Sequence, residues 1–475
     1  MPYFVCLAGY LLGVAALNPS LIDPDPFTQF SQVQIGITGN WHPPVMAAVW
    51  GILLDLLARC RITDPAVTIY SLWFVHAFFV WIGLLLCINC LPGFWRNKRP
   101  VWMQIVILFL LLWICLTLFT VAQALGKDIG FLGSYMIAAG LCLSLPKKGG
   151  SKIAIATVIV LFLFYGTALR YNALFAPIPV LCWLTLQFMP MRFALPFGLV
   201  LWFGIAGGIY AVNAHVIKSV RLYTESEMFY SDIWHLNGLT ANYILPPNGF
   251  GNDFTVINEK FFRERFDNNQ LFLRPAFEKI NAGLPPEKKI LMDKSTAVLY
   301  KTEKNVVEKY IDSLRETVRY SKEKAVSELL AVNETDGFRQ DADSLRTAWI
   351  NRIKTDLPVY IKYKTRFFYR LCRYHTMPFW GLNVIVLLPI LTAVCVRSII
   401  SSDAFKKYLL CLAMIGSAMF YLLPLWICLP SELTRYLYWF YTASFIAIVH
   451  FCAHSELFCR IIQTIQGYLE EKSQA

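Results

Sequence analysis

The stretch VTIYSLWFVHAFFVWIGLLLCINCL, residues 67–91, decides the fold class of this chain. It contains no Asp, Glu, Lys or Arg. A helix needs roughly 20 predominantly apolar residues to cross the hydrocarbon core of a bilayer, about 30 Å thick, and this run exceeds that length. His76 is the most noticeable polar group near its middle, and we interpret it as a core residue. The stretch therefore predicts a transmembrane helix.

The composition extends this prediction to the whole chain. Hydrophobic residues make up 57% of the 475 positions and charged residues 16%, with a mean hydropathy of +0.50. The net charge of +12 is attributed to basic loops and to edges that face phospholipid, so no nucleic-acid partner is predicted. We expect an all-α polytopic protein with about ten spans, near 3–18, 67–91, 101–124, 131–146, 152–169, 177–190, 194–213, 377–396, 407–428 and 435–452.

The placement of basic residues predicts the topology. Segment 44–58 either crosses the membrane or lies in its interface, since it is short, contains Asp55 and ends near Arg59 and Arg61. If it does not cross, the strongly basic loops gather on one side, as the positive-inside rule requires. We therefore favour an interfacial helix, with both termini in the cytoplasm.

Four parts of the chain follow from this topology. They are an N-terminal transmembrane module with a first outer loop at 19–66, an extracytoplasmic domain, C-terminal transmembrane helices and a cytoplasmic tail. The second half of the extracytoplasmic domain reads mostly as helix, with an amphipathic stretch over Leu345–Arg373 that Pro358 interrupts. Its basic end is interpreted as a lipid-headgroup anchor in preference to a phosphate-gripping rim. The N-terminal module covers residues 1–217, the extracytoplasmic domain 218–375, the C-terminal helices 376–455 and the tail 456–475.

The first outer loop carries the most unusual polar residues. Asp23 and Asp25 follow the first span directly, within Asp-Pro-Asp-Pro. A carboxylate there can act as a general base or bind a divalent cation, whereas the bland alternative is a rigid turn with solvated acids. Gln29, Gln32 and His42 lie close by, and His42-Pro-Pro begins the interfacial helix.

Other candidates lie at later outer edges. Arg170 and Asn172 follow one span, and Arg435 and Tyr436 precede the last one. Because the guanidinium fork suits phosphate, the two arginines point to an anionic lipid headgroup, although each could instead snorkel to the interface. Asp232 is a further candidate in the extracytoplasmic domain.

No P-loop, dinucleotide-binding, nucleophile-elbow or HExxH motif is present. Because nucleotides are not available on the outer side, a sugar donor used there must already be activated, as a sugar linked to polyprenyl phosphate is. In the acidic first loop, the Trp41-His42-Pro43-Pro44 motif and the outer arginines, the chain resembles the GT-C superfamily of membrane glycosyltransferases. The resemblance covers the whole chain in topology but only short motifs in sequence.

The resemblance implies a GT-C-like helical bundle with juxtamembrane helices in a bacterial inner membrane, its site facing the periplasm. It implies Asp25, or else Asp23, as the catalytic base. Arg435 and then Arg170 would hold the donor phosphate, and His42 would shape a substrate pocket. The acceptor would be a glycan, a lipid or a protein, and the first-loop acids could bind Mg or Mn, although metal dependence stays open.

Two rival functions remain open at this point. One is an O-antigen polymerase or ligase that uses a glycan linked to polyprenyl diphosphate. Such an enzyme would need basic outer loops, and the basic cluster near residues 362–373 is consistent with it. The other is a lipid or solute transporter, which would be expected to carry ionisable residues or broken helices at the bilayer midplane. Few central charges are present, so the glycosyltransferase is preferred.

Overall fold

A computed structural model describes most of the chain. The described segments are 2–15, 42–62, 65–89, 126–146, 149–219, 337–376, 383–400, 405–428 and 434–454, with positions 29, 33, 38, 40, 118, 121, 225, 228–229, 232–233, 236, 292–293, 296–297 and 464. The predicted site residues Asp23, Asp25 and Gln32, and most of the predicted span 101–124, lie outside these residues.

The described elements are almost all helical. The α-helices are α1 Pro2–Ala15, α3 Pro44–Arg59, α4 Pro65–Asn89, α7 Lys127–Leu143, α8 Gly150–Leu169, α9 Ile178–Leu186, α10 Met191–Ala211, α15 Gly337–Thr355, α16 Leu357–Tyr374, α17 Val384–Ile400, α18 Phe405–Cys428 and α19 Tyr438–His454. Short helical turns are η2 Tyr171–Ala173, η3 Val212–Val216 and η5 Thr434–Leu437. The strands β1 Met292–Asp293 and β2 Thr296–Ala297 pair antiparallel, with Met292 opposite Ala297.

The structure is that of an all-α membrane protein. In the described part of the chain four helical stretches are long and apolar enough to span a bilayer: Tyr70–Asn89, Gly150–Leu169, Met191–Val216 and Tyr408–Cys428. Two shorter apolar helices cover Tyr3–Ala15 and Val384–Ile400. The prediction of a membrane protein is thus confirmed, whereas these helices do not amount to ten spans.

The span predicted over 177–190 is wrong as a single crossing helix. Helix α9 has nine residues, and at 1.5 Å per residue it rises only about 14 Å, about half of the hydrocarbon core. Pro177 and Pro179 stand at its start and Pro190 lies between it and α10. The predicted segment itself has 14 residues, which as one helix would rise only about 21 Å, and these prolines confine the helix further.

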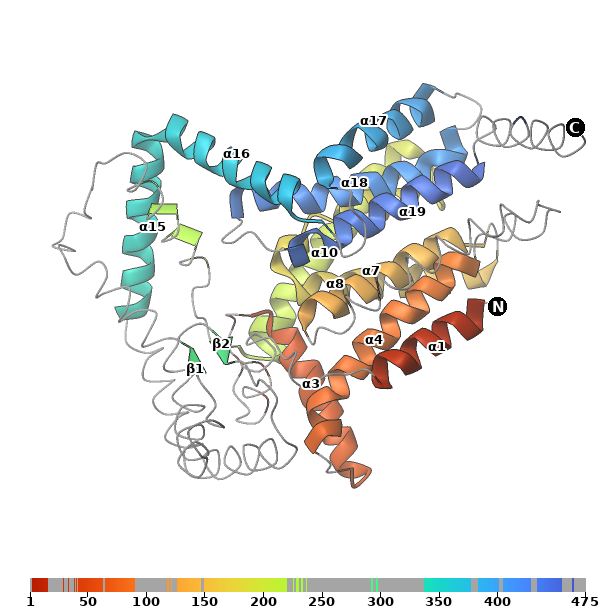
Figure 1. The fold of residues 1–475 in the computed structure, drawn as a ribbon, viewed down its shortest axis with the longest axis horizontal. Coiled ribbons are helices and arrows are strands. Elements are labelled where there is room, and N and C mark those ends of the chain that lie inside the picture. Colours follow the sequence, from red (N-terminus) through yellow and green to blue (C-terminus); the bar gives the residue numbers. More distant parts are fainter. Residues whose placement is uncertain are drawn as a thin grey trace, which may run out of the picture.

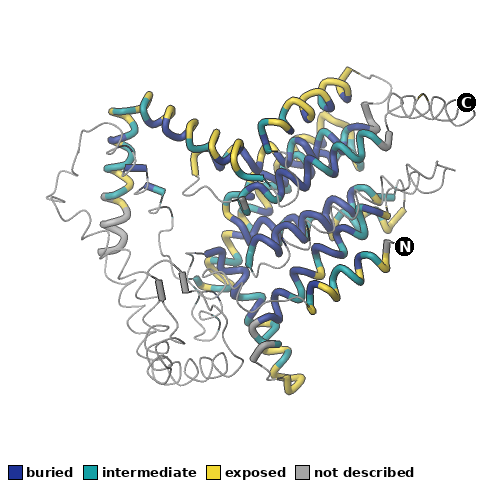
Figure 2. Tube along the Cα trace, viewed as in Figure 1, coloured by how far each residue is buried: buried dark blue, intermediate teal, exposed yellow. Residues whose placement is uncertain are grey.

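Helix α7 is the centre of the bundle. It packs between α4 and α8 and also contacts α18 and α19, and Figure 1 shows these helices side by side. Nearly every residue from Asp128 to Cys142 is buried, so α7 is dark blue along most of its length in Figure 2. A helix that is apolar on all sides is suited to such a position.

Helix α3 runs across the end of the bundle rather than along α4 and α7 (Figure 1). Its N-terminal half is buried through Met46 and Trp50, whereas Ile52 and Leu56 in its second half are exposed. Pro44 at its first position suits a helix start. The interfacial position of segment 44–58 stays a prediction.

Glycines allow α4 and α7 to approach closely. A Cβ on Gly133 would lie 2.7 Å from the Cβ of Phe79 and 2.8 Å from the backbone nitrogen of Val80. A Cβ on Gly83 or Gly140 would meet the facing helix equally closely, at 2.5 Å from a Cβ atom. Small residues at a helix interface give such close backbone approach in membrane proteins.

Gly133→Ala is therefore expected to destabilise the protein by about 1–3 kcal/mol, because the added methyl overpacks the α4–α7 contact. Equilibrium unfolding in mixed detergent micelles measures this change. Gly204→Ala on α10 is the matched control, since a Cβ there meets nothing within 4 Å. Equal stability of the two variants would contradict the packing argument.

Helices α15 and α16 stand outside the bundle (Figure 1). They meet at Asp356, just before Pro358, which occupies the first turn of α16. The sequence predicted an interruption at this proline, because proline lacks the backbone N–H that a helix interior needs. From there α16 runs back to α17 and α18.

Candidate functional site

One buried charged cluster in the described part of the chain centres on Asp128, in the first turn of α7. The Nε of Arg170 donates a hydrogen bond to Asp128 Oδ1. Arg170 caps the C-terminal end of α8, where the backbone turns extended. Its Nη1 donates to the hydroxyl of Tyr421 on α18 at 2.7 Å. One arginine thus joins three helices.

A second arginine reaches the same carboxylate. The Nε of Arg435, in η5, lies 3.7 Å from Asp128 Oδ2. The next residue, Tyr436, places its ring 4.8 Å from the guanidinium carbon of Arg170, within range of a cation–π interaction. The sequence candidates Arg170 and Arg435 therefore converge on Asp128, and the candidate Tyr436 packs against Arg170.

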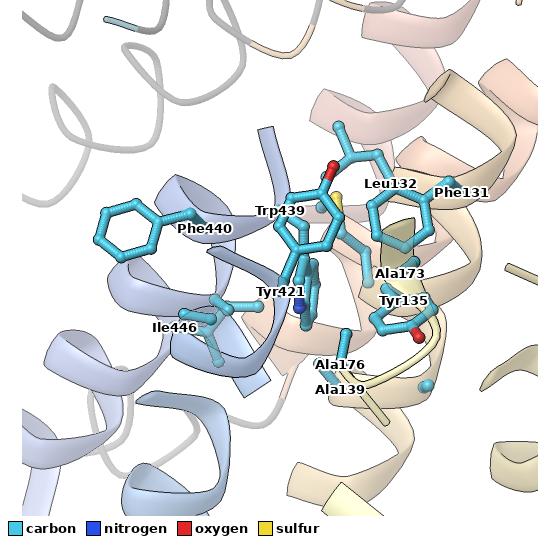
Figure 3. Packing of buried hydrophobic residues seen from close by; sticks show 14 of the residues in the cluster. Phe131, Leu132, Tyr135, Ala139, Ala173, Ala176, Tyr421, Trp439, Phe440 and Ile446 are labelled. Carbon is cyan, nitrogen blue, oxygen red and sulfur yellow. The ribbon is translucent and has the colours of Figure 1, made fainter. Parts of the chain in front are cut away.

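The aromatic core holds this cluster in place. Figure 3 shows Tyr421 against Phe131, with Trp439 and Tyr135 beside them. The rings of Tyr421 and Phe131 stack with centroids 5.3 Å apart. The rings of Tyr135 and Trp439 meet edge to face at 4.8 Å. Because the Tyr421 ring is fixed, its hydroxyl offers Arg170 a fixed acceptor.

The two arginines differ in exposure. The Arg170 side chain is 3% exposed and the Arg435 side chain 26%. Burial favours the neutral form of Arg170, but the charge of Asp128 and the facing tyrosines outweigh it and raise the pKa of the guanidinium. Arg170 is thus a charged group committed to Asp128, whereas Arg435 also faces solvent.

The first loop meets the same end of the bundle. Lys127, next to Asp128, lies with its Nζ 3.0 Å from Nδ1 of His42. Gln29 Nε2 donates to the carbonyl of Pro43 at 3.3 Å. The Tyr171 hydroxyl donates to the carbonyl of Asn40 at 3.3 Å. These contacts bring Gln29 and His42 next to the Asp128 cluster, as a shared site requires.

Asn172 is half-buried in η2, two residues after Arg170. Its position in the chain, close to Arg170, places it at the edge of the Asp128 cluster.

Asp232 belongs to a different cluster. Its Oδ1 lies 2.6 Å from Nζ of Lys364 on α16. Its Oδ2 accepts hydrogen bonds from Trp349 Nε1 at 3.1 Å and from the Tyr360 hydroxyl at 3.2 Å. Burial raises the pKa of the Asp232 carboxyl, and the attraction of Lys364 and the hydrogen bonds offset only part of this effect. These contacts favour a structural role for Asp232 over the substrate-binding role expected from sequence.

Sequence reasoning missed Asp128, Lys127, Tyr421 and Lys364. Asp128 stands at the start of an apolar helix, where an acid also favours the helix dipole. That ordinary explanation gave no reason to select it. An available signal was the combination of an acid at the start of one apolar segment and an arginine at the end of the next, since antiparallel neighbours bring these ends together.

The expectation of a bound metal ion concerns residues that the structure does not describe. Within the described residues, no three His, Cys, Asp or Glu side chains gather in a way that could hold a metal ion. Asp23 and Asp25, which carried the expectation of a cation, are not among those residues.

Comparison with known proteins adds no assignment: no protein-family model, no curated protein and no solved structure matches the chain significantly. The site must be interpreted from its own chemistry. Two guanidinium groups share one carboxylate, so the cluster keeps a positive charge, and the ammonium group of Lys127 lies beside it. Such an arrangement favours an anionic ligand.

Proposed function

We propose that this chain is a GT-C-type membrane glycosyltransferase that moves a sugar from a polyprenyl-phosphate donor to a glycan, lipid or protein acceptor. The observation that carries the proposal is the convergence of Arg170 and Arg435 on Asp128 beside the first-loop residues. A GT-C bundle of about ten spans, a bacterial inner membrane and a site facing the periplasm belong to this proposal.

The charge balance explains how the cluster would bind the donor. Asp128 neutralises one guanidinium, which leaves one positive charge for a phosphate. Arg170 is buried and hydrogen-bonded, so it orients the cluster. Arg435 is the more exposed and can approach a ligand. Arginine suits this task because its planar fork matches phosphate oxygens.

The proposed reaction is an inverting single displacement. The acceptor oxygen forms a bond to the anomeric carbon while the bond from that carbon to the phosphate oxygen breaks. Asp25, or else Asp23, takes the acceptor proton. The polyprenyl phosphate leaves with the bonding electron pair, and Arg435 stabilises its growing negative charge. The transition state is oxocarbenium-like, as in other glycosyl transfers.

Transfer from radiolabelled polyprenyl-phosphate sugars to membrane extracts tests this function with the full-length protein in nanodiscs. Arg435→Gln is expected to lower the turnover rate about 10²-fold or more, the usual cost of removing one group that stabilises developing negative charge. Replacing the catalytic base, through Asp25→Asn or else Asp23→Asn, is expected to abolish transfer. Arg397→Gln, an exposed arginine at the end of α17, is the matched control and should retain full activity.

The same assay separates the rival function. Labelled glycan moving only from polyprenyl-diphosphate donors would replace the proposal with a polymerase or ligase. Full activity in both Asp23→Asn and Asp25→Asn would remove the assigned base and overturn the mechanism.

A further inference from the structure

Helix α16 carries a basic exposed face. Its residues Lys362, Arg366, Arg370 and Arg373 recur at helical spacing and are all exposed. Tyr369 is also exposed among them. The segment 357–376 contains no Asp or Glu, so the charge of this face is positive throughout.

The opposite face of α16 packs against the rest of the protein. Lys364 is 2% exposed and pairs with Asp232, and Tyr360, Tyr363 and Leu371 are buried. Lys364 therefore faces inward to the Asp232 carboxylate, whereas the four cations of the exposed face point away from the protein. In Figure 2 the buried and exposed stretches alternate along α16, as expected of a helix packed on one side.

Three contacts fix the level of α16 along the bundle. Trp426, close to the end of the span Tyr408–Cys428, donates through Nε1 to the hydroxyl of Thr365 at 3.3 Å. The side chain of Asn383, just before α17, donates to the carbonyl of Arg373 at 2.9 Å. Tyr441, in the first turn of α19, donates to the carbonyl of His375 at 2.7 Å. The second half of α16 thus lies where α17, α18 and α19 begin or end.

The end of a membrane span is the level of the lipid headgroups, where tryptophan and tyrosine are enriched. We propose that the exposed face of α16 docks on anionic phospholipid headgroups of the surrounding bilayer. Its four cations complement the negative surface of such a bilayer. Leu357, Ile361 and Tyr374, also exposed, add the apolar contacts that an interfacial helix uses. This inference does not depend on the glycosyltransferase assignment.

Hydrogen exchange of the full-length protein tests the docking. Nanodiscs are made from phosphatidylcholine alone or from an equal mixture with phosphatidylglycerol. The backbone amides of α16 are expected to exchange several-fold more slowly in the anionic discs, and high salt should reduce the difference because it screens the charges. Inorganic phosphate added to neutral discs distinguishes the lipid from free phosphate and should not reproduce the protection.

The variant Lys362→Gln/Arg366→Gln should lose the lipid-dependent protection of α16 while α17 and α18 keep their exchange rates, which shows that the fold is intact. The matched control Arg346→Gln/Lys354→Gln removes the same charge from exposed positions of α15 and should keep the protection. Equal exchange of α16 in the two lipid compositions would overturn the proposal, as would protection by inorganic phosphate in neutral discs.

Discussion

Replacing Asp128 by alanine is expected to lower the free energy of unfolding by about 3–5 kcal/mol, the usual cost of breaking a buried ion pair by removing one partner. Arg170 would stay buried at 3% exposure without the carboxylate that compensates its charge. Its remaining hydrogen bond to Tyr421 is to a neutral oxygen. Arg435 would lose the same partner, so the proposed phosphate site would also lose its geometry.

Equilibrium denaturation in mixed micelles of dodecylmaltoside and sodium dodecyl sulfate measures the change. Asp55→Ala removes an exposed acid from α3 and should alter stability by less than about 0.5 kcal/mol. The double variant Asp128→Ala/Arg170→Met should recover part of the loss, because no buried guanidinium then lacks its partner. A double variant less stable than Asp128→Ala would contradict the account of the cluster.

Lys364→Met is expected to cause a loss of similar size, about 3–5 kcal/mol near neutral pH. The substitution leaves the Asp232 carboxylate 1% exposed with only the hydrogen bonds of Trp349 and Tyr360. The contact between α16 and Asp232 should loosen first. Lys362→Met is the matched control on the same helix, since Lys362 is exposed. A loss as large in Lys362→Met would show that the ion pair is not the cause.

The pH dependence of the Lys364→Met variant has a defined sign. Burial raises the folded-state pKa of Asp232 above the ordinary 3.8, and removal of Lys364 raises it further. The folded state then binds this proton more tightly than the unfolded state, so stability falls as pH rises from 3.8 through the raised pKa. The loss should therefore be smallest in acid and largest near neutral pH. A loss that does not vary with pH would argue against a buried charged carboxylate.

Much of the local structure was predictable because it depends on short-range pattern. The apolar run at 67–91 became the span Tyr70–Asn89, and Pro358 marked the break between α15 and α16. Proline effects within an apolar run are harder to predict. The segment 177–190 has the composition of a span, yet its prolines leave only the short α9.

The arginines of the candidate site could be predicted from the sequence, but the carboxylate that they share could not. Arg170 and Arg435 stood out because arginines are rare at the ends of apolar segments on the outer side. Asp128 did not, because one acid in the first turn of a helix is common. Asp232 was selected, but its burial depends on the ion pair with Lys364 of α16, which lies far from it in the chain.

The sequence by itself determined that this is a helical membrane protein, since a helix satisfies all the backbone N–H and C=O groups of a long apolar run within the run itself. It also predicted the helix break at Pro358. Only the tertiary structure decided which charges meet. Arg170 and Arg435 are far apart in the chain, and their common contact with Asp128 exists because the start of α7, the end of α8 and η5 lie at the same level of the bundle. Which side chains pair across a bundle depends on how its helices pack, and the sequence of any one helix does not specify that pairing.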